Sequence, residues 1–474
     1  MNKPIARLFV LVLAMFAALV AFTSRWTVFD ASALQDNSLN KRTLLETADV
    51  QRGTIYANDN NNDVIAQSTR EGGQYVRQYP QGSLFAAPIG YAFPNQGTAG
   101  VEAYHNDVLT GTPLDHESVI DQLEGKQNAG DSVYTTLDPT AQRVAMQMLR
   151  ESKHTGAVVA MVPSTGAIRV WATDPTYDPN RIPSGKEGGS QFDRVTQAED
   201  APGSAQKVVT AIAAIDSGKF TPNSYINGDS PQTFEGIPLN NDEDRSYGDV
   251  TLTYALTNSI NTVYANVAQT LGPGLIYKYM RRLGYYANPP IDLPSGELVP
   301  SGVRGGGTDN ALVPTSDWDT PLVGIGEGHL EVTPLQMVMV ASAVANGGRL
   351  MTPHITSKVV NADGETVEQV KPSLFSVVMK PSTATAVGTM MEDVVQDGTA
   401  AQALAGFKIK VAGKTGTAEL GNSTNSPNEA WFIAYAPYRD IAVAVVVEHT
   451  FDYGASAAAP IARAVIQSLA GASG

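Results

Sequence analysis

Strand-like segments at both ends of the C-terminal two-thirds of the chain restrict its fold more than any other feature. Two apolar stretches meet at a turn over residues 163–166, and two more flank a polar turn at 438–440, so each pair favours a hairpin. A further segment alternates apolar residues with lysines, as in a strand with one face in water. The predicted strands are residues 156–162, 167–173, 407–411, 431–436 and 441–447.

Segments with helical spacing of apolar residues separate the two groups of strands and follow the last one. We expect helices over residues 204–215, 251–271, 334–345 and 460–469. A strand pair, several helices and then three strands favour one antiparallel sheet flanked by helices, which is an α/β (α+β) fold.

A long uncharged segment near the N-terminus predicts a membrane anchor. Residues 8–24 carry no charge, and Lys3 and Arg7 precede them. As a helix the segment is about 25 Å long, against roughly 30 Å of bilayer hydrocarbon. Arg25 can reach up to the headgroups and Trp26 can lie at the interface, so a span is feasible. The positive residues before the segment predict an N-terminus in the cytosol and an extracellular remainder.

We therefore expect residues 1–7 to be a cytoplasmic tail and residues 8–29 a single-pass signal-anchor in the cell membrane. The alternative is a cleaved signal peptide, because Ala18 and Ala21 are small enough for a cleavage site. The apolar run is longer than the usual core of a signal peptide, which favours the anchor.

The stretch from 30 to 150 is polar, rich in Asn and Gln, and short of sustained periodicity. It predicts a strand at 133–136 and a helix at 140–149 that an Asp-Pro pair opens. We expect residues 30–150 to form a β-rich domain without chemistry of its own. Residues 151–474 would then form a second domain.

Charge and composition exclude several functions. Lys plus Arg is 32 against 47 for Asp plus Glu, a formal net charge of -15. The chain therefore lacks the basic surface that binding to nucleic acid requires. It has no cysteine, which excludes disulfides, thiolate metal sites and a cysteine nucleophile. The histidines are scattered, without a metal-binding pair, so we do not expect a histidine-rich metal site.

Ser204 and Lys207 form the first of three motifs that carry chemistry. The expected helix places the two side chains on the same side, so the lysine amine can reach the serine hydroxyl. A serine becomes a nucleophile when a base lies within hydrogen-bond reach, and burial or a nearby cation can make a lysine that base. The helix N-terminus favours the oxyanion that forms on attack. A second match at 38–41 lies beside the apolar segment and is expected at the surface.

Ser259 and Asn261 form the second motif. A serine beside an activated Ser–Lys pair can relay a proton to a leaving group, and an Asn amide can hold a substrate carbonyl. The same spacing recurs at 38–40, 423–425 and 426–428. The first of these lies close to the membrane, and the other two follow the third motif in an expected loop.

Lys414, Thr415, Gly416 and Thr417 form the third motif, at the end of the alternating strand. Lys414 would attract a substrate carboxylate and disfavour protonation of Lys207. The two threonines offer hydroxyl donors to the same carboxylate. The glycine lets a substrate backbone approach the strand.

The order of the three motifs is the one that penicillin-binding proteins and class A β-lactamases share. The chain resembles a class B penicillin-binding protein, and most of all the actinobacterial type called penicillin-binding protein A. The resemblance extends from about residue 50 to the C-terminus. The segments that carry it, in the family's order, are Arg52-Gly53-Thr54-Ile55, Gly100-Val101-Glu102, Leu109-Thr110-Gly111, Thr136-Leu137-Asp138, Pro163-Ser164-Thr165-Gly166, Tyr177-Asp178-Pro179-Asn180, Thr333-Pro334-Leu335-Gln336, Ala345-Asn346-Gly347-Gly348 and Trp431-Phe432-Ile433-Ala434.

The resemblance implies a peptidoglycan D,D-transpeptidase that crosslinks cell-wall stem peptides. The family fold places the catalytic Ser and Lys on a helix against a five-stranded antiparallel sheet, behind a pedestal of the dimerisation type at 30–150. In the family's mechanism Ser204 attacks the D-Ala-D-Ala bond after Lys207 takes its proton. Ser259 with Lys414 nearby passes a proton to the leaving D-Ala, and Asn261 positions the peptide.

The resemblance also implies binding sites and partners. Thr415, Gly416 and Thr417 would bind the substrate, and the backbone N–H groups of Ser204 and Thr417 would hold the oxyanion. The implied partners are peptidoglycan stem peptides, β-lactam antibiotics and a polytopic membrane polymerase that makes the glycan strand. The implied role lies in cell division, cell shape or both, without a cofactor or metal.

Two residues depart from the family pattern. Gln206 stands where an apolar or aromatic residue is usual, and Glu327 replaces a usual Gln. We expect Gln206 to alter the packing of the helix and Glu327 to add a negative charge near the cleft. The alternative functions are a β-lactamase or D,D-carboxypeptidase, in which water replaces the acceptor amine, and a non-catalytic scaffold or β-lactam sensor.

Overall fold

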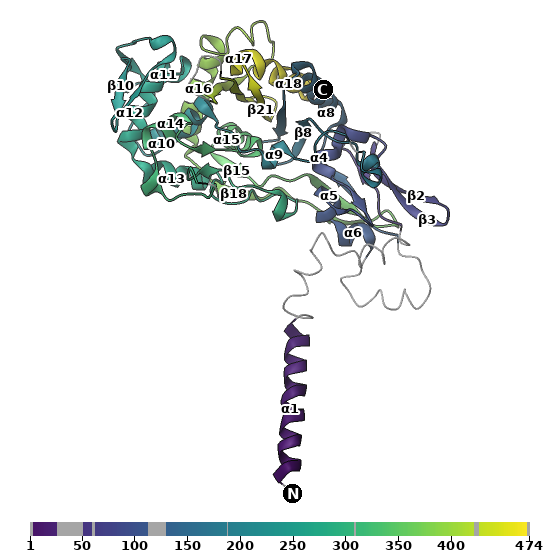
Figure 1. Ribbon diagram of the computed structural model, residues 1–474. Helices are drawn as coiled ribbons and strands as arrows, with labels where there is room; N and C mark the ends of the chain where they lie inside the picture. The colour runs from purple at the N-terminus through teal and green to yellow at the C-terminus, as the bar shows by residue number, and fades with distance from the viewer. Residues whose placement is uncertain are drawn as a thin grey trace.

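The computed structural model describes residues 3–25, 51–58, 62–111, 129–186, 188–307, 310–420 and 426–471. Figure 1 shows α1, Lys3–Ser24, standing apart from a large folded body. The apolar side chains of α1 are exposed, and in the described part of the chain α1 is the one helix long and apolar enough to cross a membrane. The expected anchor residues 26–29, with Trp26, lie outside the described residues.

A six-stranded sheet organises the N-terminal part, in the order β17-β16-β6-β1-β2-β3. Its strands are β1 Ile55–Tyr56, β2 Val64–Glu71, β3 Gln74–Gln78, β6 Ser132–Thr135, β16 Thr356–Val360 and β17 Thr366–Gln369. The strand expected at 133–136 is therefore present as β6. Two of the six strands come from residues well beyond position 150, so this sheet is closed by the C-terminal part of the chain.

Short helices and a small hairpin complete the N-terminal part. They are η2 Gly82–Phe85, α4 Ala86–Ile89, β4 Ala92–Phe93, β5 Gly97–Thr98, α5 Gly100–Tyr104, α6 Asn106–Thr110 and α8 Pro139–Ser152. The expected helix at 140–149 is confirmed as α8, and the carboxylate of Asp138 caps it by accepting from the Ala141 N–H at 2.9 Å.

A five-stranded antiparallel sheet forms the centre of the C-terminal part, in the order β19-β20-β21-β7-β8. Its strands are β7 Gly156–Met161, β8 Ile168–Asp174, β19 Ala412–Glu419, β20 Asn428–Ala436 and β21 Ile441–Thr450. The expected single antiparallel sheet, built from strands at both ends of this part, is thus confirmed. Within it β7 pairs with β21, although the two strands lie near opposite ends of this part of the sequence.

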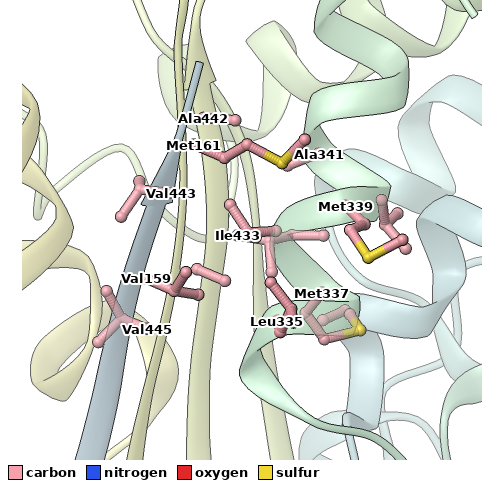
Figure 2. Close-up of a cluster of buried hydrophobic side chains, with 14 of the residues drawn as sticks. Val159, Met161, Leu335, Met337, Met339, Ala341, Ile433, Ala442, Val443 and Val445 are labelled. Atoms are coloured by element: carbon pink, nitrogen blue, oxygen red, sulfur yellow. The ribbon is translucent and has the colours of Figure 1, made fainter. Parts of the chain in front are cut away.

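Apolar residues on both faces of this sheet are buried under helices. Val159, Ala444 and Ile433 lie opposite one another in register and share the face that α15, Pro334–Ala345, covers. Figure 2 shows α15 packed on this face, while Val443 and Val445 point to the opposite face. There α18, Ala459–Gly471, and α8 close the core. Strands covered on both sides explain the nearly unbroken apolar runs of the sequence.

The strand expected at 407–411 is absent, because these residues form a bend and irregular backbone before β19. Ala412 pairs with Tyr435, and β20 ends one residue later at Ala436. Residues before Ala412 therefore have almost no partner strand to extend. Their alternation has another origin, since Phe407 and Ile409 pack against the core while Lys410 pairs with Glu392 at the surface.

The remaining elements of the C-terminal part form a helical lobe and short hairpins. They are η3 Pro179–Ser184, α9 Arg194–Gln197, η4 Gly203–Gln206, α10 Lys207–Asp216, β9 Tyr225–Asn227, β10 Gln232–Phe234, β11 Ile237–Leu239, η5 Asp242–Asp244, β12 Asp249–Thr251, α11 Leu252–Thr257, α12 Asn261–Leu271, α13 Pro273–Arg282, η6 Ser295–Glu297, β13 Gly302–Val303, η7 Thr315–Asp317, α14 Thr320–Ile325, β14 Leu330–Glu331, β15 Arg349–Met351, β18 Leu374–Val377, α16 Pro381–Gln396 and α17 Gly454–Ala457.

A fully buried carboxylate joins the segments of the N-terminal part. Glu102 on α5 accepts from Arg52 Nε and from Arg77 Nε, each at 2.6 Å, and from the Tyr79 hydroxyl at 3.1 Å. Burial acts to raise the pKa of Glu102, but the two guanidinium groups outweigh it and lower the pKa below its ordinary value. The ion triad therefore contributes stability at neutral pH, and loses it only as the pH falls through this depressed pKa.

We expect Glu102→Gln to destabilise the protein by about 3–5 kcal/mol at pH 7, because two buried arginines would lose their countercharge. Thermal unfolding of the detergent-solubilised chain measures the change. The control is Glu71→Gln, which alters an exposed carboxylate bonded to Gln78 and is expected to leave the unfolding temperature nearly unchanged. An equal effect of both substitutions would contradict a role for the triad.

Three carboxyl groups and one arginine are buried together beside the central sheet. Asp200, Glu429 on β20 and Glu448 on β21 each have a buried oxygen without a hydrogen-bond partner in the described residues. Arg194 pairs with Glu448 at 3.0 Å. Burial, together with the neighbouring carboxyl groups, raises the pKa of Asp200 to about 8 and that of Glu429 to about 9. One cation does not balance three carboxylates, so Glu429 is neutral in the fold at pH 7.

Glu429→Gln is expected to stabilise the protein at alkaline pH. A raised carboxyl pKa makes folding less favourable as the pH rises from the unfolded value, near 4.5, to about 9. The glutamine removes this penalty, by about 1–3 kcal/mol at pH 8 and little at pH 5. Unfolding temperatures of both proteins across this range test it. Glu448→Gln, which deprives Arg194 of its partner, is the control and is expected to destabilise at both pH values.

Candidate functional site

Ser204 and Lys207 lie at the start of a buried helix, as expected from their spacing. Ser204 is in the 3₁₀ turn η4, and Lys207 is the first residue of α10, so the helix predicted at 204–215 begins with a tighter turn. Lys207 Nζ donates to Ser204 Oγ at 2.9 Å. The Lys207 side chain is fully buried, and Ser204 is half-buried, so the hydroxyl stays accessible while the amine does not.

The turn that holds Ser204 packs directly on strand β19. A Cβ atom at Gly416 would lie 2.5 Å from the Pro202 carbonyl oxygen and 3.1 Å from the Ala205 Cβ. Only a glycine at this position lets the Ser204 turn approach the strand. Gly416 was expected to make room for a substrate backbone, and the structure gives it this additional packing role.

Ser259 lies where the expected helix 251–271 breaks into α11 and α12. Its backbone has a φ of 59°, an unusual value for a serine, and Ile260 N–H returns to the Ala255 carbonyl. The break frees the Ser259 carbonyl oxygen, which accepts from Lys207 Nζ at 2.7 Å. The sequence pattern predicts one continuous helix here. The structure breaks that helix at Ser259, where a backbone carbonyl contacts Lys207.

Asn261 begins α12 and completes the contacts of Lys207. Its Oδ1 accepts from Lys207 Nζ at 2.6 Å, and its Nδ2 donates to the Asn240 carbonyl at 3.1 Å. The amide is therefore held from both sides. Asn240 belongs to the loop before η5, which also contributes the Asn241 side chain as acceptor for the Thr262 N–H.

Lys414 brings a second buried amine to the same place. It lies opposite Ile433 in the register of β19 and β20, on the sheet face that α15 covers. Its Nζ donates to Ser259 Oγ at 3.0 Å and to the Thr415 carbonyl at 2.8 Å. Because Lys207 Nζ lies 3.3 Å from the same Ser259 Oγ, one hydroxyl bridges the two amines.

Burial controls the charge of both lysines. It lowers the pKa of Lys207 to about 7, against the opposing pull of the Glu327 and Asp242 carboxylates. Burial and then repulsion by Lys207 lower the pKa of Lys414 well below its ordinary value. Lys414 was expected to depress the pKa of Lys207, but loss of solvation is what depresses it, and repulsion between the two amines acts on the pKa of Lys414 instead. A neutral Lys207 at physiological pH can accept the proton of Ser204.

The threonines of the third motif lie along the same strand. Thr415 Oγ1 is 2.7 Å from Thr399 Oγ1, and Thr417 Oγ1 accepts from the Gly454 N–H at 3.3 Å. Thr399 follows α16, and the sequence pattern did not single it out because an isolated threonine after a helix carries no motif. The Ser204 N–H lies in the first turn of a helix, where backbone donors lack intrahelical acceptors.

Gln206 is buried, and its Oε1 accepts from the Tyr285 hydroxyl at 3.0 Å. This contact ties η4 to the segment after α13 and agrees with the expected change in helix packing. One other match to the motifs, at 426–428, lies among the described residues, and it does not join the site. Residues 38–41 and 423–425 lie outside the described residues, and Asn428 begins β20 opposite Glu419, away from Lys414.

The geometry thus brings Ser204, Lys207, Ser259, Asn261 and Lys414 together from three separate stretches of the chain. The cluster supplies a nucleophilic hydroxyl, a buried amine of depressed pKa, and a second hydroxyl that can pass a proton. Within the described residues no group of three or more acidic or histidine side chains is placed to hold a metal ion. The arrangement is suited to serine acyl transfer.

Comparison with known proteins places the chain among relatives of similar length. It is 29% identical to the peptidoglycan D,D-transpeptidase PbpA of Mycolicibacterium smegmatis, over 98% of both chains. Among solved structures, a D,D-transpeptidase domain from Eggerthella lenta is 29% identical with a TM-score of 0.77, over 90% of this chain and 100% of that one. The imipenem acyl-enzyme complex of penicillin-binding protein A from M. tuberculosis is 26% identical with a TM-score of 0.78, over 89% and 99%.

Family models match both parts of the chain. Residues 52–133 match the penicillin-binding protein A dimerisation domain. Residues 156–467, about two-thirds of the chain, match the penicillin-binding protein transpeptidase domain. Sequence, fold and motif geometry agree: the chain belongs to the penicillin-binding protein transpeptidase family.

Proposed function

We propose that this protein is a peptidoglycan D,D-transpeptidase that crosslinks cell-wall stem peptides through an acyl-enzyme on Ser204. The observation that carries the proposal is the contact of Lys207 Nζ with Ser204 Oγ at 2.9 Å, at a lysine whose pKa burial lowers to about 7. The M. smegmatis relative is named a D,D-transpeptidase, and penicillin-binding protein A of M. tuberculosis forms acyl-enzymes with β-lactams.

In the first half of the reaction a donor stem peptide acylates the enzyme. Neutral Lys207 takes the Ser204 proton, and the oxygen attacks the carbonyl carbon between the two terminal D-Ala residues. Backbone N–H groups of Ser204 and Thr417 hold the oxyanion. The C–N bond then breaks, and the leaving D-Ala amine takes a proton through Ser259, whose hydroxyl bridges the two lysines.

Asn261 holds the donor peptide, and until the D-Ala leaves, Thr415 and Thr417 bind its terminal carboxylate along β19, with Gly416 between them. In the second half an amine from a neighbouring stem attacks the ester. It forms the crosslinking amide and returns the proton to Ser204. A β-lactam acylates Ser204 as a mimic of the donor and leaves slowly, which would make the protein a target of these antibiotics.

The apolar helix α1 supports a single-pass anchor with the N-terminus in the cytosol and the catalytic domain outside the cell. Residues 1–7, 8–29, 30–150 and 151–474 would then be the tail, the anchor, the pedestal and the transpeptidase domain. A polytopic membrane polymerase that makes the glycan strand is the proposed partner of the anchor and pedestal. The role proposed for the protein is in cell division, cell shape or both.

Incubation with a β-lactam tests the nucleophile. Mass spectrometry of the intact protein is expected to show one stable adduct, on the peptide that contains Ser204, and no adduct in Ser204→Ala. Rapid turnover of the drug instead of a stable adduct would favour the β-lactamase alternative. Normal crosslinking by Ser204→Ala would leave only a scaffold or sensor function.

The rate of acylation is expected to rise with pH through a midpoint of about 7, because only neutral Lys207 accepts the Ser204 proton. Below the midpoint the second-order rate constant for penicillin falls about tenfold per pH unit. Stopped-flow or quenched labelling between pH 5.5 and 8.5 measures it. A rate that does not change across this range would exclude Lys207 as the base.

A further inference from the structure

Glu327 lies beside the nucleophile at a position that the backbone holds firmly. It follows Gly326, the left-handed residue after α14 with a φ of 92°. The Gly326 carbonyl accepts from the Gly203 N–H at 3.0 Å, and a Cβ on Gly326 would overlap the Gly203 carbonyl group. Because Gly203 precedes Ser204, this contact places Glu327 next to the serine turn.

The Glu327 carboxylate has no hydrogen bond or ion pair with any residue that the structure describes. The Glu327 backbone makes two hydrogen bonds. Its N–H donates to the Leu322 carbonyl at 3.0 Å, and its carbonyl accepts from the Leu330 N–H at 3.3 Å. Glu327 is an exposed residue, although the atoms around its carboxylate remove part of the hydration of that group. A well-held backbone with a free, accessible carboxylate leaves this group available to a ligand.

The charges near Glu327 do not balance. Partial burial raises the pKa of Glu327, Lys207 opposes this shift, and Glu419 at the end of β19 adds to it. Lys207 is half-neutral near pH 7, and the pKa of Lys414 lies well below its ordinary value. The site therefore lacks a permanent cation for Glu327, and a positively charged ligand group would supply one.

The proposed reaction provides such a group. It joins a carbonyl donor to an amine, and primary amines of peptides carry a proton at neutral pH because their ordinary pKa is near 10. We propose that Glu327 is a specificity-determining residue that binds a protonated primary amine carried by a stem peptide. The amine can belong to the donor stem or to the incoming acceptor, and an acceptor ammonium would pass one proton to the Glu327 carboxylate or to solvent before its nitrogen attacks the ester. This inference rests on the proposed transpeptidase function.

Asp242 offers a matched control. Its carboxylate also raises the pKa of Lys207, but it lies in η5, on the side of the site that Asn240 joins to Asn261. Removing either negative charge is expected to move the acylation midpoint of Lys207 to lower pH. Only Glu327 is expected to govern the use of an amine, so the two effects can be separated.

The test compares the full-length protein with Glu327→Gln and Asp242→Asn in detergent. In the donor arm, release of D-Ala is measured from a stem pentapeptide with a free side-chain amine and from the same peptide acetylated there. In the acceptor arm, the acyl-enzyme formed from the acetylated peptide is divided between water and an added amine-bearing stem. Labelling of each variant by penicillin at Ser204 reports separately on the proposed function.

Glu327→Gln is expected to reduce the preference for the free amine about tenfold in one arm, which identifies the source of the amine, while Asp242→Asn leaves that preference as it is. An unchanged preference in both arms, in a Glu327→Gln protein that penicillin still labels, would overturn the inference. Failure of penicillin to label the unsubstituted protein would instead overturn the proposed function.

Discussion

Burial of Lys207 is the constraint on which the rest of the site depends. An amine without contact to water remains in a folded protein only where oxygen atoms surround it, or where it loses its charge. Here both conditions hold, since Ser204, Ser259 and Asn261 all place oxygens within hydrogen-bond distance and the pKa of the lysine falls to about 7. The same burial that weakens its hold on a proton makes it a base for Ser204.

The elements around Lys207 can be understood as supports for this arrangement. The helix that carries Asn261 is separated from α11 so that the Ser259 carbonyl turns toward the amine. Strand β19 carries a glycine at the point where the Ser204 turn presses against it. Lys414 shares the Ser259 hydroxyl, and two neighbouring buried amines cannot both keep a full charge. Packing and proton chemistry are therefore decided by the same few contacts.

Much of this could be predicted from the sequence, and the exceptions have physical causes. Helix α15 matches its predicted range, 334–345, because every position in it except Gln336 is apolar or small and its start is capped. Residues 407–411 alternate like a strand, yet the partner strand ends at Ala436 and leaves them unpaired. Residues 251–271 have helical periodicity throughout, and no glycine or proline announces the break at Ser259. Local sequence patterns predict burial well. They do not show where a partner strand ends, or where a helix must break so that a backbone carbonyl can accept a hydrogen bond.

The chemical residues were within reach of sequence reasoning because their order and spacing are unusual in combination. Their supports were not, since Thr399, Asn240 and Tyr285 act through single contacts with Thr415, Asn261 and Gln206. Buried ion pairs are likewise hard to predict from the sequence. The ion triad at Glu102 joins segments that the sequence separates by tens of residues, and only the fold brings them together.

Strands β16 and β17 complete the sheet of the N-terminal part although they come late in the chain. In the direction of synthesis, that sheet cannot be finished until residue 369 has been made. Most of the helical lobe, with Ser204 and Ser259, is made before then, while β19 with Lys414 follows. The N-terminal and C-terminal parts are therefore not completed one after the other, because each includes strands made on both sides of the other in the sequence.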